Sequence, residues 1–400
     1  MSIKGHLPVH PGLQRIRDAL QRLRGQHLYR TRRVLESPQG LEVRVAGETL
    51  LSFCSNDYLG LANDARVIAA MQAGARRYGA GSGASHLVTG HSIPHHALEE
   101  ELAAFVGAER ALLFSTGYMA NLGVASALLD RRATAFEDKL NHASLIDAAR
   151  LSGARVKRYA HADLAQLETQ LGATQGDGLI LTDGVFSMDG DVADVARMAA
   201  LAQRYAAWLL VDDAHGLGVL GAHGRGTLER FGLQPQAPVI LLGTLGKAFG
   251  TFGAFIAGDE DLIEYLIQRA RPYIYTTALP PAVAEATRAS LGIVQEEGWR
   301  REALNARIAQ FRSGAAQLGL TLLDSPTPIQ ALILGEAQAA LAASEMLRAR
   351  GILVPAIRPP TVPAGSARLR ITFCAQHTEQ HVERLLEALA AVPHQSSEPA

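Results

Sequence analysis

The sequence contains little cysteine and little net charge. Cys54 and Cys374 are the only cysteines among 400 residues, and their wide separation indicates neither a disulfide framework nor a zinc motif. Lys and Arg number 38 against 39 Asp and Glu, and no basic stripe is present, which argues against nucleic acid as a partner. The 48% hydrophobic content and the length predict a globular protein with a large core.

Signals for secretion and membrane insertion are also missing. The start of the chain, MSIKGHLPVHPGLQ, lacks the apolar segment of a secretory signal, so we expect a cytoplasmic protein. Residues 239–258 form a weakly charged stretch about as long as a membrane span, but this stretch contains Lys247 and several glycines. It therefore predicts buried strands around a functional lysine, with no membrane as partner.

The hydrophobic pattern predicts an α/β fold. Residues 11–25 have the spacing of an amphipathic helix, and from about residue 65 to 260 helices alternate with short apolar runs. Many of these runs are apolar throughout, which is typical of a parallel sheet covered by helices on both faces. The strands predicted up to residue 260 are 41–45, 49–54, 111–114, 133–136, 178–182, 208–211, 239–242 and 254–256.

The remainder of the chain predicts a smaller α+β domain. A helical stretch at 280–318 precedes strands at 321–323, 330–334 and 369–372 and helices at 337–350 and 377–391. We expect four parts in the chain. They are an N-terminal arm with a small hairpin at 1–50, a large domain at 51–280, a C-terminal domain at 281–393 and a flexible polar tail at 394–400.

Polar residues follow three of the predicted strands. They are Ser187 and Asp189 in SMDGD, Asp212 and His215 in DDAH, and Thr244 and Lys247 in TLGK. Because ligands of parallel sheets gather outside the carboxyl ends of the strands, we expect these side chains to lie together. Lys247 has apolar neighbours, and desolvation favours the neutral amine that a Schiff-base nucleophile requires. Asp212 either caps a helix or pairs with a heterocyclic cation, and its place after the buried strand LLV suits the second role.

Two further motifs fit a phosphorylated, planar cofactor. FSTGYMAN, at 114–121, runs from a strand into a helix, and the amides of that helix N-terminus can bind phosphate beside Gly117. A purely structural turn is the alternative. His142 in NHAS either caps the next helix or stacks on a flat ring.

Arginines near the C-terminus predict a carboxylate site. Arg358 lies in RPPTVPAG, and the alternation in ARLRIT puts Arg368 and Arg370 on one face of a strand. A guanidinium there can bind a carboxylate with two hydrogen bonds, although a surface salt bridge is the simpler interpretation for Arg368.

Two other patterns point elsewhere and carry less information. Gly79, Gly81 and Gly83 suggest a dinucleotide site, but a helix rather than a strand precedes them. His91, His95 and His96 suggest a metal site, yet adjacent His95 and His96 point to different faces of a helix. A helix surface explains these histidines better, and we expect no metal.

Taken together, the motifs resemble the α-oxoamine synthases, which are pyridoxal-phosphate (PLP) enzymes of the aspartate aminotransferase fold, fold type I. The resemblance covers nearly the whole chain. It implies a large domain with a mostly parallel seven-stranded sheet between helices, a smaller α+β C-terminal domain and an N-terminal helical arm. The motifs are SNDYLG, GSGAS, STGYMAN, HAS, GVFSMDGD, VDDAHG, TLGKAFG and RPPTVPAGSARLR.

The resemblance implies a role for each matching residue. Lys247 would bind PLP as a Schiff base and later remove the substrate's α-proton, Asp212 would pair with the pyridinium nitrogen, and His142 would stack on the ring as a catalytic and substrate-binding residue. The other implied cofactor contacts are Ser187 and His215 at the 3-oxygen, and Gly117, Tyr118 and Thr244 at the phosphate end.

The resemblance also implies the substrate contacts and the assembly. Arg370, with Asn56, would bind the carboxylate of the amino acid. Around the acyl substrate we expect Arg30, Arg358 and Thr361. Such enzymes are homodimers with the site between two subunits, so Thr276 or Thr277 would serve the partner's phosphate.

The implied reaction is an acyl transfer in biotin biosynthesis, in which L-alanine condenses with pimeloyl-CoA or pimeloyl-acyl carrier protein and loses carbon dioxide. RPPTVPAG favours this member over sisters that use glycine or serine, namely 2-amino-3-ketobutyrate ligase, 5-aminolevulinate synthase and serine palmitoyltransferase. A non-catalytic cofactor-binding module and a nicotinamide dehydrogenase are the alternatives from other classes. Ser85-His86 and Thr251-Phe252 depart from the usual family pattern near the acyl pocket.

Overall fold

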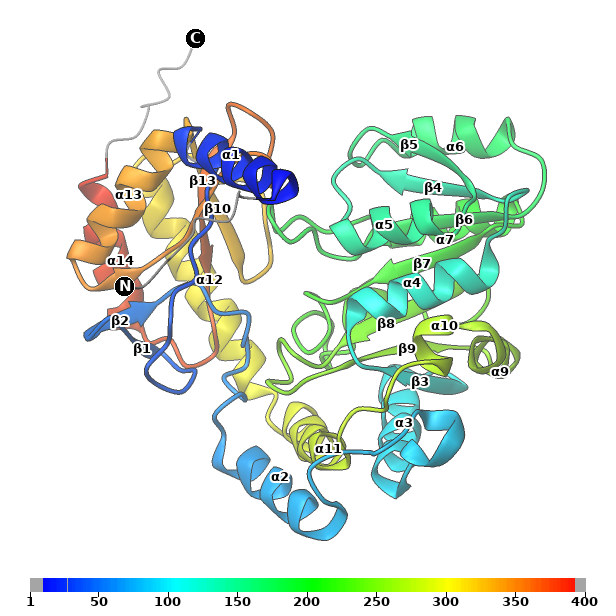
Figure 1. Cartoon of the computed structure of the whole chain (residues 1–400). Coiled ribbons are helices and arrows are strands. Elements are labelled where there is room, and N and C mark those ends of the chain that lie inside the picture. The colour runs from blue at the N-terminus through cyan, green and yellow to red at the C-terminus, as the bar shows by residue number, and fades with distance from the viewer. Residues whose placement is uncertain (1–9, 27, 393–400) are drawn as a thin grey trace, which may run out of the picture.

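The computed structural model describes residues 10–26 and 28–392, and the predicted polar tail lies outside these residues. Figure 1 shows two lobes with a gap between their ribbons, and the carboxyl ends of most strands in the larger lobe point toward the smaller lobe. Within the described residues, no helix combines the length and the apolar character needed to cross a bilayer.

The larger lobe is built on a seven-stranded sheet. Its strand order is β3-β9-β8-β7-β6-β4-β5, and β9 runs antiparallel to both of its neighbours while the other pairs are parallel. This sheet confirms the predicted α/β fold. The strands are β3 (Arg110–Phe114), β4 (Thr134–Asp138), β5 (Arg155–Tyr159), β6 (Gly178–Asp183), β7 (Trp208–Asp212), β8 (Val239–Thr244) and β9 (Ala254–Gly258).

Both faces of the sheet are buried, which explains the continuous apolar runs. Along β7, Leu209 and Val211 belong to one hydrophobic cluster and Leu210 belongs to another, so alternate residues enter cores on opposite faces. The helices of this lobe are α3 (Ile93–Val106), α4 (Gly117–Leu128), α5 (Ala143–Leu151), α6 (Leu164–Gly172), α7 (Val195–Arg204), α8 (Thr227–Arg230), α9 (Glu260–Arg269) and α10 (Arg271–Ile274).

One strand of this sheet is not among those that the apolar pattern predicts. β5 has the sequence RVKRY and pairs only with β4, at the edge of the sheet. Four of its five residues are exposed or half-buried. Because an edge strand needs little apolar surface, its sequence lacks the signal that marks the central strands.

The smaller lobe contains two three-stranded sheets. One joins β1 (Glu42–Val45) and β2 (Glu48–Ser52) to β11 (Ile352–Leu353), so the N-terminal hairpin pairs with a strand some 300 residues later. The other joins β10 (Ile329–Gly335), β13 (Ala367–Thr372) and β12 (Ala356–Ile357). The helices of this lobe are α1 (Pro11–Gly25), α12 (Trp299–Gln317), α13 (Ala337–Ala349) and α14 (Glu379–Ala390). α11 (Pro281–Glu296) packs against α2 (Ala65–Tyr78) and against α3 of the larger lobe, and the π-helical turn η1 (His86–Gly90) contacts α10.

Two local predictions for this lobe need correction. Residues 321–323 do not form a strand, because only a single bridge joins Leu322 to Leu332. The last helix begins at Glu379 rather than at 377, because the Thr378 side chain caps it by accepting from His381 N.

His161 connects two loops of the large lobe at the carboxyl ends of the strands. Its Nδ1 lies 3.0 Å from Asp138 Oδ1, and its Nε2 lies 3.0 Å from Asp191 Oδ2. Hydrogen bonds to Asp138 and then Asp191 raise the pKa of His161 from 6.5 to about 10. The charged ring therefore links the end of β4 to the loop that follows β6.

A pH-dependent contribution to stability follows from the raised pKa of His161. The contribution is complete below about pH 6.5 and is lost as the pH rises through about 10, because the folded protein then releases the extra proton. Replacing His161 by Gln is expected to lower the free energy of unfolding by about 1.5–3 kcal/mol at pH 6, and by much less at pH 10.5. Urea unfolding of both proteins at the two pH values measures this difference. An equal loss at both values would show that His161 is not charged in the folded protein.

Candidate active site

Two carboxylates lie side by side at the ends of β6 and β7. Asp183 and Asp212 are register partners in the two parallel strands. Asn121 Nδ2 donates to Asp212 Oδ2 at 2.7 Å, and Ala214 N donates to Asp212 Oδ1 at 3.2 Å. Burial and the nearby charge of Asp212 raise the pKa of Asp183 well above its ordinary value. The raised pKa favours the protonated form of Asp183.

Lys247 follows β8 and lies close to the predicted histidine. Its Nζ is 2.9 Å from His215 Nε2, and burial lowers the pKa of Lys247 from 10.5 to about 8. His215 is buried, and burial followed by the charges of Lys247 and Arg370 lowers its pKa well below 6.5. The pair therefore provides a neutral imidazole beside an amine that is partly neutral near physiological pH.

His142 both caps α5 and presents its ring to this group. Its Nδ1 accepts from Ser144 N at 3.2 Å and lies 2.7 Å from Ser144 Oγ, while His142 N donates to Asp183 Oδ2 at 2.7 Å. Desolvation by neighbouring protein atoms lowers the pKa of His142, which favours a neutral ring. The capping role and the stacking role considered from the sequence are thus compatible.

The N-terminus of α4 lies against the end of β8. A Cβ built on Gly117 would come within 3.0 Å of Thr244 Cγ2, so the two segments are close enough that a side chain at 117 would crowd the site. Thr116 caps the helix by accepting from Met119 N at 3.2 Å. Tyr118, next in the helix, bonds through its hydroxyl to Asp147. Free amides in this first turn favour an anion.

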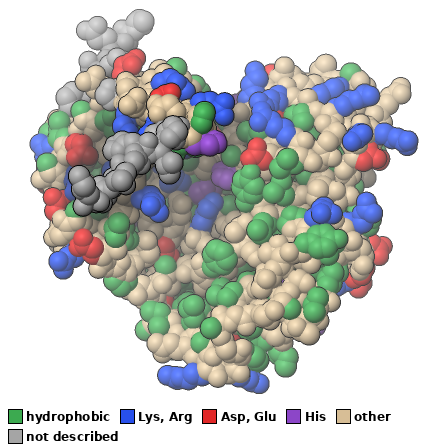
Figure 2. Space-filling view, viewed as in Figure 1, with side chains coloured by type: hydrophobic (Ala, Val, Ile, Leu, Met, Phe, Trp, Pro, Cys, Tyr) green, Lys and Arg blue, Asp and Glu red, His purple; other side chains and the backbone are tan. Residues whose placement is uncertain are grey.

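The predicted carboxylate site spans the two lobes. Arg370 on β13 donates from both terminal nitrogens to Asn56 Oδ1 at 3.3 Å and from Nε to Ser187 O at 2.6 Å. Only 6% of Arg370 is exposed, so its charge is held among polar partners from both lobes. Figure 2 shows that the surface is hollowed between the lobes, with basic and histidine side chains inside.

Arg368 has a different environment from the one that its surface interpretation predicts. Its side chain is buried and forms an ion pair with Asp189. Arg368 Nε also donates to Ser366 O at 2.9 Å. The surface interpretation is therefore wrong, because β13 is covered on the face that carries both arginines and packs there against the SMDGD loop.

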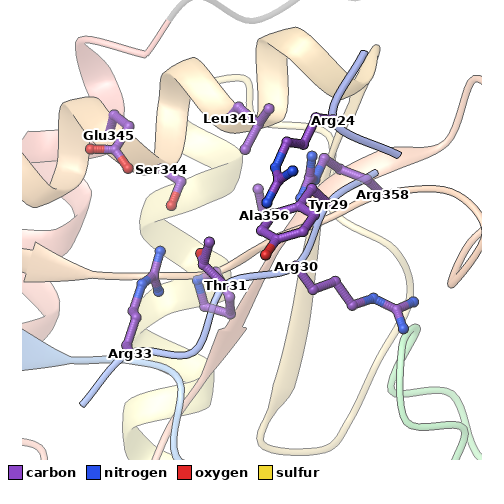
Figure 3. A pocket seen from close by; sticks show the side chains of 11 residues that line it. Arg24, Tyr29, Arg30, Thr31, Arg33, Leu341, Ser344, Glu345, Ala356 and Arg358 are labelled. Atoms are coloured by element: carbon purple, nitrogen blue, oxygen red, sulfur yellow. The ribbon is translucent and has the colours of Figure 1, made fainter. Parts of the chain in front are cut away.

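The expected acyl contacts lie apart from the lysine. Arg30 and Arg358 line a cavity of about 710 Å³ in the smaller lobe, and Arg24 packs over the Tyr29 ring at 4.5 Å (Figure 3). In that view Arg30 extends away from the other side chains. Thr361 is exposed and donates its backbone N–H to Arg358 O at 3.0 Å. None of the residues that line this cavity belongs to the group around Lys247.

Gly79 from the glycine pattern and His95 from the histidine pattern both have structural roles in the fold. Gly79 ends α2 with a φ of 84°, and a helix precedes it, so the strand that a dinucleotide fingerprint needs is absent there. His95 is fully buried and its Nε2 bonds to Leu279 O at 2.6 Å, which corrects its placement on a helix surface. His96 is exposed, as that interpretation expects.

Sequence reasoning missed three residues of the site. The Tyr58 hydroxyl lies 2.6 Å from His215 Nδ1 and donates to Asn56 Oδ1 at 3.2 Å. Asn121 holds Asp212, and Asp183 holds the backbone of His142. Tyr58 and Asn121 lie inside motifs already singled out, SNDYLG and STGYMAN, and Asp183 ends a buried strand as Asp212 does.

The residues present fit PLP. Asp212 offers a carboxylate oxygen for a ring nitrogen, and His142 offers a flat ring whose neutral form is favoured by its lowered pKa. Asn121 Oδ1 is buried and has no hydrogen-bond partner, so the Asn121 amide that holds Asp212 keeps an acceptor free. The first turn of α4, where Gly117 leaves space beside Thr244, suits a phosphate. Lys247 supplies an amine with a lowered pKa.

Comparisons with known proteins agree with these features. A family model described as aminotransferase class I and II matches residues 48–389. An 8-amino-7-oxononanoate synthase from Stutzerimonas stutzeri is 63% identical over 367 residues, which is 92% of this chain and 94% of the relative.

Solved structures show the same likeness. A lysine-to-alanine variant of serine palmitoyltransferase from S. paucimobilis, solved with a PLP–myriocin aldimine bound, has a TM-score of 0.89 at 30% identity and covers 95% of this chain and 97% of its own. An 8-amino-7-oxononanoate synthase from Francisella tularensis has a TM-score of 0.75 at 34% identity and covers 85% of this chain and 97% of its own. The chain therefore belongs to the PLP-dependent aminotransferase class I and II family and, within it, to the 8-amino-7-oxononanoate synthases.

Proposed function

We propose that the protein condenses L-alanine with a pimeloyl thioester to give 8-amino-7-oxononanoate, the step of biotin biosynthesis that its relatives' name describes. A carbon–carbon bond forms between the α-carbon of alanine and the thioester carbonyl. The thiol of coenzyme A or of acyl carrier protein leaves, and the alanine carboxylate departs as carbon dioxide.

One chain of hydrogen bonds carries this proposal. It runs from Lys247 Nζ to His215 (2.9 Å), from His215 to the Tyr58 hydroxyl (2.6 Å), and through Asn56 to Arg370 (3.2 and 3.3 Å). A half-buried amine and a buried guanidinium are thus connected through three intervening side chains. This arrangement supports an α-amino acid as substrate, because such a molecule presents a nitrogen and a carboxylate to two different partners.

The roles proposed for the protein follow from these contacts. PLP, when bound, withdraws the electron pair that remains after the α-proton leaves. Lys247 would hold the cofactor and then accept that proton, as a pKa of about 8 suits a general base near neutral pH. Asp212 would hold a proton at the ring nitrogen, with Asn121 keeping its carboxylate in place. His142 would cover one face of the ring, and Ser187 and His215 would contact its oxygen.

The remaining contacts concern the phosphate and the acyl substrate. Gly117, Tyr118 and Thr244 would hold the phosphate at the start of α4. Arg30, Arg358 and Thr361 would serve the acyl thioester, since the first two add positive charge to the cavity of about 710 Å³. A terminal carboxylate or the phosphates of coenzyme A are the chemical groups that such a surface attracts.

We propose a homodimer that works in the cytoplasm. Thr277 is exposed and forms an isolated bridge with Ser85, so its loop lies at the surface of the large lobe, where a second subunit could reach it. From this loop, Thr276 or Thr277 would reach the phosphate in the partner. Cys54 and Cys374 are both free, which agrees with a reducing compartment.

Replacing Arg370 by lysine tests the carboxylate site. Lysine keeps the charge but cannot donate to Asn56 and Ser187 and still bind a carboxylate with two parallel hydrogen bonds. The KM for L-alanine is expected to rise about 10-fold to 100-fold, with a smaller change in kcat. Steady-state kinetics with alanine as the varied substrate measures this, and Arg348→Lys, which alters an exposed ion pair with Glu48, is the control. An unchanged KM would place the carboxylate elsewhere.

A substrate panel tests the function itself. Purified holoenzyme is incubated with pimeloyl-CoA or pimeloyl-acyl carrier protein and with L-alanine, glycine or L-serine, and the products are identified by mass spectrometry. We expect 8-amino-7-oxononanoate from alanine with at least one of the two thioesters. Activity with glycine or serine alone would assign the protein to a sister enzyme, and the absence of any product would exclude the family's reaction.

A further inference from the structure

A second cluster of histidines lies outside the candidate active site, where η1 meets the first turns of α3. His91, His96 and Glu99 each present one ligand atom there, and these three atoms lie within 4.8 Å of one another. His96 and Glu99 are three residues apart on α3 and therefore share a face of the helix. His91 immediately precedes Ser92, the residue that caps this helix.

His91 is oriented by another histidine. Its Nδ1 lies 3.0 Å from His86 Nδ1, and its Nε2 lies 3.9 Å from Glu99 Oε2. When His91 donates from Nδ1 to His86, its Nε2 carries a lone pair that faces the carboxylate. Histidines that bind metals are usually held in this way, with one ring nitrogen bonded to a neighbouring group and the other bonded to the ion.

Glu99 is held in a comparable manner. Its Oε1 accepts from Leu113 N at 2.9 Å, which leaves Oε2 directed toward His91. The Glu99 side chain is 13% exposed and that of His91 is 28% exposed, so both groups are largely withdrawn from water while one edge stays accessible. The backbone of β3 thus positions the carboxylate as His86 positions the imidazole.

The third ligand comes from an exposed and adjustable side chain. His95 is not available, because its Nε2 bonds to Leu279 O and its Nδ1 bonds to Ser92. His96 is 69% exposed and lies 3.4 Å from the equally exposed Glu100, so its ring can rotate toward His91 and Glu99. Glu100 is the group that competes for His96 in the absence of an ion.

We propose that His91, His96 and Glu99 form a binding site for a divalent transition-metal ion of the zinc class. Two imidazoles and one carboxylate are a typical zinc ligand set, with water in the fourth position, and they do not suit Mg²⁺ or Ca²⁺. Zinc bonds of about 2.0–2.1 Å bring tetrahedral ligand atoms to about 3.4 Å from one another, so closure requires a movement on the order of 1 Å. The third ligand is Glu99 and not His95. For this reason the spacing of the histidines in the sequence does not reveal the site.

A metal ion at this site would stabilise the fold and would take no part in the reaction at Lys247. The ring of His86 stacks on Tyr273 with centroids 4.8 Å apart, and the neighbouring Ser85 bridges to Thr277. The proposed site therefore joins α3, through His91 and His86, to α10 and to the segment that follows it. Metal binding is expected to stabilise this segment and raise the Tm in proportion to the logarithm of the Zn²⁺ concentration above the Kd.

Equilibrium dialysis with Zn²⁺ tests the proposal. Purified holoenzyme is first treated with a chelator, and bound zinc per chain is then measured for the wild type, His96→Gln and Glu99→Gln. His223→Gln is the matched control, because His223 is 70% exposed and also pairs with a glutamate, Glu229, on another part of the surface. We expect one zinc ion per chain to be lost, or bound at least about 10-fold more weakly, in His96→Gln and Glu99→Gln only.

A second variant examines the supporting histidine. His86→Phe keeps a ring that can stack on Tyr273 but removes the hydrogen bond to His91, and it is expected to weaken zinc binding about 10-fold to 100-fold. Because His96 is exposed, His96→Gln is expected to fold normally, and its melting curve without metal verifies this. A zinc isotherm for His96→Gln that matches the wild type and the His223→Gln control would overturn the proposal.

Discussion

Replacing Lys247 by alanine is expected to lower kcat by a factor on the order of 10⁴. The variant loses the amine that would hold the cofactor and accept the α-proton, and general-base catalysis alone contributes up to about 10⁴. The sequence has only three other lysines, at positions 4, 139 and 157. Of the two in the described part of the chain, Lys139 is exposed and Lys157 bonds to Thr174 Oγ1, so neither belongs to the group around Lys247. The measurement is kcat with L-alanine and pimeloyl-CoA at saturating PLP.

The control for this prediction is Lys139→Ala. Lys139 is exposed, follows β4 and bonds through its backbone N–H to Tyr159 O, so the substitution changes a lysine without touching the candidate site. Borohydride reduction of wild-type holoenzyme followed by peptide mapping is expected to find PLP attached to Lys247. Attachment to a different lysine, or nearly normal turnover in Lys247→Ala, would refute the role assigned to this residue.

Replacing Asp212 by asparagine is expected to lower kcat about 10²-fold to 10³-fold while PLP still binds. The substitution keeps the size of the side chain but removes the charge that would stabilise a protonated ring nitrogen, and electrostatic groups of this kind contribute about that much. Lys247 and the first turn of α4 stay in place to hold the cofactor. Kinetics and the visible absorption of the purified variant together separate the loss of chemistry from the loss of binding.

Asp183→Asn is the matched control for Asp212. Asp183 lies beside Asp212 in the sheet, and burial together with the Asp212 charge raises its pKa well above the ordinary value. An asparagine resembles a protonated aspartate and can still accept from His142 N, so we expect less than about a 10-fold loss of kcat. A larger loss in Asp183→Asn than in Asp212→Asn would reverse the roles of the two carboxylates.

Many strands of the large lobe can be predicted because the pattern that marks each of them is contained in a short stretch of sequence. A strand that is covered on both faces must be apolar along its length. A polar residue where such a strand finishes lies at the carboxyl ends of the strands, where ligands bind, as Asp212 does at the end of β7. The edge strand β5 escapes this rule because it is not fully covered. Asp183 also ends a buried strand, but it lies just outside the motif GVFSMDGD and was therefore not predicted as a site residue.

Contacts between distant segments are not readable from spacing. Tyr58 meets His215 across 157 residues, and Arg370 meets Asn56 across 314, because the two lobes close on each other. The buried state of Arg368 likewise depends on Asp189, which lies 179 residues earlier in the chain. For these positions the family resemblance implied Arg370 together with Asn56, whereas the contacts of Tyr58 with His215 and of Arg368 with Asp189 were found only in the fold.

The release of carbon dioxide tests the central claim most directly. Holoenzyme is given L-alanine labelled with ¹⁴C in its carboxyl group together with pimeloyl-CoA, and labelled carbon dioxide and free thiol are counted in the same sample. A decarboxylative condensation predicts one carbon dioxide per thiol, with neither formed when alanine or the thioester is omitted. Thiol released without labelled carbon dioxide would show hydrolysis or simple acyl transfer, and would contradict the account.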